Sequence, residues 1–285
     1  HHGLGESAPG FALSYAFGRA VLVVEYVRAG VYIPNARSLT TRYAIGFAIA
    51  ATLWVISAFV APSWRFGLWI SAIIIDLATP FAARKYQLEL PPQASHLPER
   101  FGLFTMIVLG EAIIGVVNGV SQQHWHVLSV ISAVFGLSIA FSLWWVYFDN
   151  LGGTPIQTAR SQGRIRAMAI WLYTHLPLVI GIAAAGVGVE SVLLSKQVNS
   201  LGDPQRWLIC GSVALCWLSI GILHRLGVIR YCKIRAKYRI AAVPVVLAIA
   251  FFGKGLLPVA VIGLVAVVCI VQVVQDTSGN RPTTR

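Results

Sequence analysis

The chain has 285 residues, of which 57% are hydrophobic and only 11% are charged, and its formal net charge is +12. A soluble domain carries about twice that charged fraction, so a soluble globular core is excluded. Because the charged residues lie between long apolar runs, the composition indicates a membrane protein with several spans. In such a protein an excess of basic residues is explained first by its orientation in the membrane, and only second by a nucleic-acid partner.

Nine apolar runs are long enough to cross a bilayer core of about 30 Å as helices. In chain order they cover Phe11–Tyr32, Tyr43–Val60, Phe66–Ala83, Phe101–Val120, Val127–Phe148, Met168–Val189, Trp207–His224, Ile240–Phe252 and Leu256–Val274. The last two come from one run that is too long for a single span, and Gly253, Lys254 and Gly255 predict a tight turn inside it. We therefore expect an all-α transmembrane helix bundle, with residues 1–285 forming one integral membrane domain.

The distribution of basic residues predicts the orientation of this bundle. Loops on one side hold 17 of the 22 Lys and Arg residues. The other side holds four, which are Arg65, Lys196, Arg206 and Lys254. Since cytoplasmic loops carry the excess of Lys and Arg, we expect the N-terminus outside and the C-terminus in the cytoplasm. The chain begins with His1 and has no signal peptide, so we expect a fragment without its true N-terminus.

The most basic segment runs from His224 to Arg239, with the sequence HRLGVIRYCKIRAKYR. We interpret it first as a topology determinant that lies on anionic lipid headgroups. A regulatory or partner-binding loop is the alternative. The short loops leave no module for nucleic-acid binding.

Several ionisable residues fall inside predicted spans, where such residues usually face the bundle interior and mark function, and four of them are candidates for a functional role. Arg19 needs a partner on another helix. Asp76 lies on a stripe of small and polar residues, and either pairs with Arg19 or moves protons. Glu111 lies ~18 Å into its span, with no charged residue three or four positions away on its own helix. It either carries a proton or fixes packing through a hydrogen bond.

His175 is the fourth residue, and its neutral-range titration would suit a proton relay. Haem ligation has no supporting motif. We also find no metal, phosphate or dinucleotide motif, so we expect no cofactor and no metal, and we interpret Cys210, Cys216, Cys232 and Cys269 as structural thiols.

A second set of candidates lies at the predicted cytoplasmic border. Asp149 ends the stretch FSLWWVYFDN, in which Trp145 and Tyr147 are typical of an interfacial aromatic belt. Asp149 is either an interface anchor or the mouth of a polar pathway. His96, Glu99 and Arg100 open the span that holds Glu111.

Three segments, HLPERFGLFTMIVLGEAII, LWWVYFD and YTHLPLVIGI, resemble in order and spacing the bacterial low temperature requirement protein A family. The resemblance extends from about Gly3 to Val274. It implies a protein of the bacterial inner membrane, linked to growth in the cold, that begins with further spans. Three more spans would make twelve, arranged as two parallel six-span halves with a boundary near residues 84–98. By motif match it adds Gly102 and Pro177 to the positions of interest.

Several ionisable residues at membrane depth, without a soluble domain, favour a transporter or permease-like protein that couples to protons. In this interpretation Glu111 and Asp76 are the buried carboxylates, Arg19 is their counter-charge and His175 is a relay. The alternatives are a membrane-embedded enzyme on a lipid-type substrate, using His96, Glu99, Arg100 and Asp149, and a non-catalytic sensor or scaffold. We lean against an enzyme.

Overall fold

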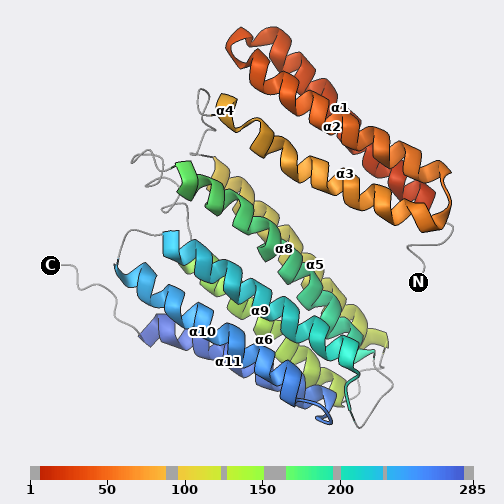
Figure 1. Ribbon diagram of the computed structural model, residues 1–285. Coiled ribbons are helices and arrows are strands. Elements are labelled where there is room, and N and C mark those ends of the chain that lie inside the picture. Colours follow the sequence, from red (N-terminus) through yellow and green to blue (C-terminus); the bar gives the residue numbers. More distant parts are fainter. Residues whose placement is uncertain are drawn as a thin grey trace. The chain divides into compact units, whose positions relative to one another are not determined.

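The computed structural model describes residues 7–87, 96–122, 127–150, 165–194, 200–226 and 230–278. Every regular element in these ranges is helical, which confirms the all-α prediction (Figure 1). Each predicted span corresponds to one long helix. These helices are α1 (Ala8–Tyr32), α2 (Arg37–Phe59), α3 (Pro62–Ala82), α5 (Leu97–Gln122), α6 (Val127–Asn150), α8 (Ile165–Leu193), α9 (Asp203–Leu226), α10 (Arg230–Phe252) and α11 (Pro258–Ser278). Two short elements, η2 (Pro34–Ala36) and α4 (Arg84–Gln87), complete the described part.

Eight helices of the described chain are long and apolar enough to cross a membrane, and α10 is the long helix outside this set. The predicted span began at Ile240, whereas α10 begins ten residues earlier, at Arg230. Most of the basic segment is therefore helix and not loop. Two of its arginines are paired inside the bundle, as described below. Residues 227–229 of that segment lie outside the described residues.

Proline and glycine explain several helix boundaries. Pro62 and Pro258 occupy the first position of α3 and α11, where a missing backbone N–H costs nothing. The predicted turn between α10 and α11 is present, and Gly255 adopts a φ of 84°, a left-handed conformation that glycine reaches without strain.

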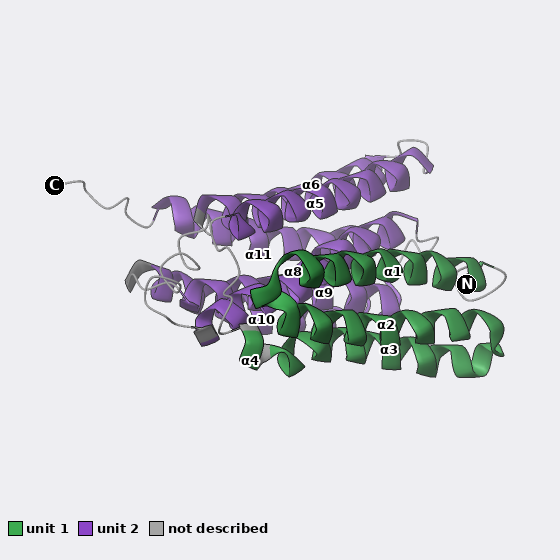
Figure 2. Ribbon diagram, turned by 90° about the horizontal axis from the view of Figure 1, so that it is seen from above, with its two compact units in different colours: residues 1–92 green, residues 93–285 purple. Residues whose placement is uncertain are grey.

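The chain divides into two compact units, residues 1–92 (unit 1) and residues 93–285 (unit 2) (Figure 2). In unit 1, α1 packs against α2 and α2 packs against α3. A small aromatic core around Trp54 and Trp69 fills the space between them. The proposed boundary between two six-span halves near residues 84–98 stays a prediction, and residues 88–95 lie outside the described residues.

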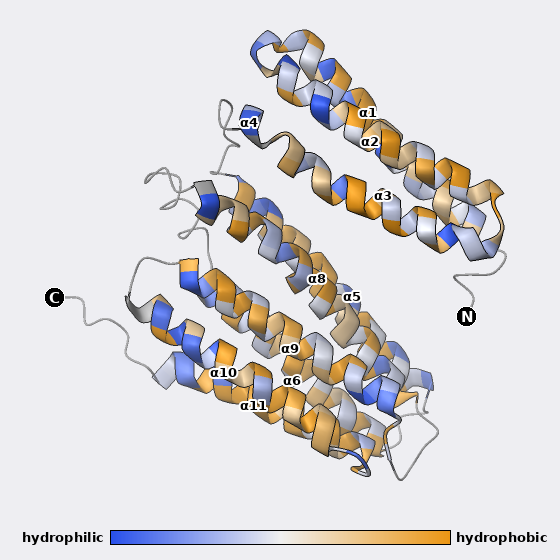
Figure 3. Ribbon diagram, in the orientation of Figure 1, coloured by the Kyte–Doolittle hydropathy of each residue, from blue (hydrophilic) through white to orange (hydrophobic). Residues whose placement is uncertain are grey.

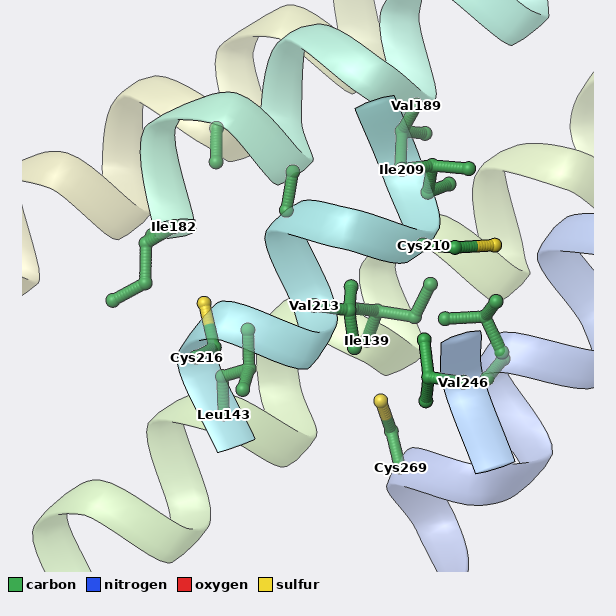
Figure 4. Close-up of a cluster of buried hydrophobic side chains, with 14 of the residues drawn as sticks. Ile139, Leu143, Ile182, Val189, Ile209, Cys210, Val213, Cys216, Val246 and Cys269 are labelled. Atoms are coloured by element: carbon green, nitrogen blue, oxygen red, sulfur yellow. The ribbon is translucent and has the colours of Figure 1, made fainter. Parts of the chain in front are cut away.

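The described part of unit 2 is a bundle of six long helices. Contacts run from α8 to α9, α10, α11, α6 and α5 and then back to α8, so that the helices form a closed ring. Its core is aliphatic, with Ile139, Leu143, Ile182 and Val213 among the buried side chains drawn in Figure 4. Hydrophilic residues gather toward the helix ends and hydrophobic residues along the middles, as a bilayer requires (Figure 3).

Two of the four basic residues predicted to lie outside are held by the C-terminal ends of helices. Arg65 donates from Nε to the carbonyl of Ser57 at 3.0 Å and from Nη2 to that of Val60 at 3.2 Å, at the end of α2. Arg206 donates from Nε to the carbonyl of Ala250 at 2.7 Å, at the end of α10. Helix C-terminal carbonyls lack intrahelical partners and attract cations, so both arginines have a structural role.

Candidate functional site

Residues from all three motif segments meet in the interior of unit 2. Thr105 comes from α5, Tyr147 from α6 and His175 from α8, and each of these side chains is buried. The Tyr147 hydroxyl lies 3.1 Å from Nε2 of His175, and the Thr105 side chain lies within interaction distance of Tyr147. We call these three residues the polar triad.

The partners of His175 determine which of its nitrogens carries the proton. Nδ1 lies 2.7 Å from the carbonyl oxygen of Trp171, which can only accept. In a neutral imidazole Nδ1 is therefore the donor, and Nε2 accepts a hydrogen bond from the Tyr147 hydroxyl. Thr105 in turn donates to the carbonyl of Phe101 at 2.8 Å. Every polar group of the triad thus has a partner.

Aromatic rings hold the imidazole in place. The ring of His175 lies 4.2 Å from that of Trp171 and 4.6 Å from that of Phe101, measured between centroids. Phe101 and Trp171 meet each other edge to face at 5.3 Å. Since Phe101 belongs to the motif that opens α5, the ERFGLF segment supplies a wall of the site as well as a helix start.

A small apolar cavity lies beyond the polar triad on the same three helices. Its lining includes Leu109, Leu143 and Ile182, which are one or two helical turns from the members of the triad. Gly136, Ala185 and Gly186 also line it. Ile139, Leu143, Ile182 and Val189, which belong to this lining, appear in Figure 4. We call the line of contact between α5 and α8 the seam. A cavity lined by aliphatic groups stays dry, so it separates the triad from the far end of this seam.

At that far end, Glu190 of α8 packs over Gly115 of α5. A Cβ atom at Gly115 would lie 3.3 Å from Oε2 of Glu190, so the glycine makes room for the carboxylate. Sequence analysis missed Glu190, because it follows directly after the predicted span Met168–Val189, whereas α8 continues to Leu193.

Glu111, the central candidate of the sequence analysis, faces away from the interior of unit 2. Its side chain is exposed on the outer face of α5, with Ile107 and Ile114 on either side. Within the described residues it makes no hydrogen bond and no ion pair, and it is not part of the polar triad.

In unit 1, Arg19 and Asp76 form an ion pair between α1 and α3, with Nη2 2.9 Å from Oδ2. Arg19 also donates to the Tyr15 hydroxyl at 2.6 Å and lies over the ring of Phe47. Thr79, one turn after Asp76, packs against Gly46 of α2. This contact packs α3 closely against α2, one helical turn from Asp76.

A second polar cluster joins α10 to α11 in unit 2. Arg235 and Arg239 both contact the carboxylate of Asp276, and Arg239 also donates to Oε1 of Gln272 at 2.7 Å. Arg239 is fully buried and lies over the ring of Trp217. Sequence analysis missed this cluster, although Arg235 and Arg239, like Gln272 and Asp276, are four residues apart and so share one helix face.

The remaining border candidates do not gather into one site. Nδ1 of His96 and Oε2 of Glu99 are 3.7 Å apart, and both side chains are exposed, as is Arg100. Asp149 is exposed at the end of α6, within electrostatic range of Asp276. Trp145 belongs to an aromatic cluster with Phe141 and Trp144.

The motif match had added Gly102 and Pro177. Gly102 lies opposite Phe148, because a Cβ atom there would be 3.5 Å from its ring, and Pro177 lies inside α8. The described residues contain no group of three or more His, Cys, Asp or Glu side chains arranged to hold a metal. All four cysteines are free thiols.

The long apolar helices and the charges buried between them define a multi-span α-helical protein of a membrane. The chain belongs to the bacterial low temperature requirement A protein (LtrA) family, whose family model matches residues 1–274. It is 26% identical over 155 residues to "Uncharacterized protein RA0937" of Rhizobium meliloti (strain 1021), a match that covers 50% of this chain and 37% of that protein. The match thus spans well under half of the relative's length. No solved structure matches the chain.

Proposed function

We propose that this chain is part of a transporter-like protein of the bacterial inner membrane in which the polar triad carries protons. The hydrogen bond between Tyr147 and Nε2 of His175 is the observation on which the proposal rests. It places a titratable group and a hydroxyl in contact, buried from bulk water, where three helices meet.

The triad can take up a proton without leaving a polar group unpaired. With His175 neutral, Tyr147 donates to Nε2. When Nε2 gains a proton it becomes a donor, so the Tyr147 hydroxyl accepts from it and turns its own hydrogen toward Thr105. Thr105 continues to donate to the carbonyl of Phe101. Because both states are satisfied, proton uptake costs less than it would at an isolated buried imidazole.

The surroundings of His175 favour the same role. The centroids of the Trp171 and Phe101 rings lie 4.2 Å and 4.6 Å from that of the imidazole, within the distance at which an aromatic ring can attract a cation. The apolar cavity beyond the triad is a dry gap that protons would cross only after hydration or a change of conformation, as at hydrophobic gates in channels. Glu190 would then be the acceptor at the opposite end of the seam.

A lipid-directed membrane enzyme is the alternative that sequence analysis left open, and within the described residues its predicted members form no common cluster of polar side chains. His96 and Glu99 form an exposed pair at the start of α5, and Asp149 is exposed at the end of α6. Sensing or scaffolding has no specific contact in its favour either.

Proton flux into liposomes tests the proposal. The intact protein is reconstituted around a trapped pH-sensitive dye, and a pH gradient is imposed. We expect a flux above that of empty liposomes, reduced at least tenfold by His175→Gln and Tyr147→Phe and unchanged by Tyr238→Phe, an exposed tyrosine of α10. Flux equal to empty liposomes, or variants as active as the wild type in flux and in growth in the cold, would refute it.

A further inference from the structure

A groove of about 400 Å³ runs between α1 and α2 in unit 1. It lies toward the end of the two helices that η2 connects, which is the basic side predicted to be cytoplasmic. Val23, Val27, Val31, Ala44, Ile45 and Ala48 are among the apolar residues of its wall. Tyr26, Arg37, Thr40 and Thr41 are its polar residues.

The polarity of the groove changes along its length. Arg37, Thr40 and Thr41 belong to the first turns of α2, the end of the helix that the charge distribution predicts to lie at the cytoplasmic headgroups. Ala44, Ile45 and Ala48 follow about 10–16 Å further along the helix from Arg37, where the hydrocarbon begins. One end of the groove is therefore polar and cationic, and the rest is apolar.

Arg37, the basic residue in the lining of the groove, has no protein partner among the described residues. Its side chain is exposed and makes no hydrogen bond or ion pair there. Arg28 is paired with Glu25 at 3.2 Å, and Arg42 lies over the ring of Tyr86. The hydroxyl of Thr41 is also exposed beside Arg37.

We propose that this groove binds an anionic phospholipid of the cytoplasmic leaflet, with its phosphate on Arg37 and Thr41 and one acyl chain along the apolar wall. Guanidinium groups bind phosphate through paired hydrogen bonds, and basic pockets between transmembrane helices on this side select anionic headgroups.

Native mass spectrometry of the intact protein tests the site. The protein is reconstituted in nanodiscs with equal phosphatidylglycerol and phosphatidylethanolamine, released, and its retained lipids are counted. We expect phosphatidylglycerol to be retained preferentially. Arg37→Gln, which removes the charge, and Ala48→Phe, which fills the groove, should each reduce this retention at least fivefold. The matched control Arg42→Gln removes a charge outside the groove and should change it less than twofold.

Three results would overturn the proposal. Equal retention of the two lipids by the wild type would exclude selection of the charged headgroup. Equal loss in Arg37→Gln and Arg42→Gln would show a general surface attraction. Cross-linking of an Ala48→Cys variant to another protein segment would show that protein occupies the groove. The melting temperature of each variant without added lipid establishes that the variant is folded.

Discussion

The Tyr147 hydroxyl lies 3.1 Å from Nε2 of His175, and this contact joins α6 to α8 within the buried core of unit 2. Both residues belong to motif segments of the family, and Thr105, which completes the triad, belongs to the third. The three segments therefore contribute to one buried site, although they are far apart in the sequence.

Tyr147→Phe should destabilise the protein as well as affect any proton transfer. The change leaves Nε2 of His175 buried without its donor, which costs about 1–3 kcal/mol in free energy of unfolding. Unfolding in mixed micelles measures this difference, with Tyr238→Phe as the exposed control. An equal effect of the two substitutions would argue against a strong buried hydrogen bond at Tyr147.

Asp276→Asn should be among the most destabilising changes in unit 2. It removes the carboxylate that both Arg235 and Arg239 contact, and it leaves two buried cations without a counter-charge. Breaking a buried ion pair in this way costs about 3–5 kcal/mol.

The matched control for Asp276→Asn is Glu25→Gln, which breaks the exposed pair with Arg28. An exposed pair contributes at most about 1 kcal/mol, so this variant should unfold almost like the wild type. Comparable unfolding curves for the two variants would mean that the cluster between α10 and α11 is solvated and contributes little.

Gly46→Ala should separate α2 from α3. A Cβ atom at this position would lie 2.1 Å from Oγ1 of Thr79, and forcing extra volume into a packed contact costs about 1–3 kcal/mol. Gly18→Ala is the control, because no atom lies within 4 Å of its added Cβ and helix propensity alone should stabilise it by about 0.5–1 kcal/mol.

Adding Thr79→Ala to Gly46→Ala tests the cause, because it removes Oγ1 and Cγ2, the two atoms of Thr79 that lie closest to the added Cβ. The melting temperature of the double variant should then rise toward that of the single variant Thr79→Ala. No recovery would mean that Gly46 acts through something other than its contact with α3.

Arg206→Met should loosen the end of α10 next to the Gly253–Gly255 turn. The arginine is buried, and its loss leaves the carbonyl of Ala250 without a charged donor, at a cost of about 1.5–3 kcal/mol. Hydrogen–deuterium exchange should show faster exchange in the last turn of α10, and not in α1. Arg225→Met, at an exposed position of α9, should leave that exchange unchanged.

The class of protein and the approximate position of each long helix could be predicted from the sequence alone. Span length and hydropathy are local properties, because a bilayer of fixed thickness needs a helix of about 20 apolar residues. Local charge pairs such as Glu25 with Arg28 were also predictable, because residues three apart share a helix face. The ends of the helices were predicted less accurately, and α10 begins well before its apolar run.

The contacts between polar residues of different helices could be identified only from the tertiary structure. Tyr147 and His175 are 28 positions apart, and Arg239 and Asp276 are 37 apart. Such contacts depend on which helix faces pack together, and a helix that is apolar on most sides does not record that choice in its hydropathy. For the same reason Glu111, a carboxylate at the middle of an apolar helix, looked like an interior residue, whereas the packing of unit 2 turned toward its interior the opposite face of α5, which carries Thr105 and Ala112.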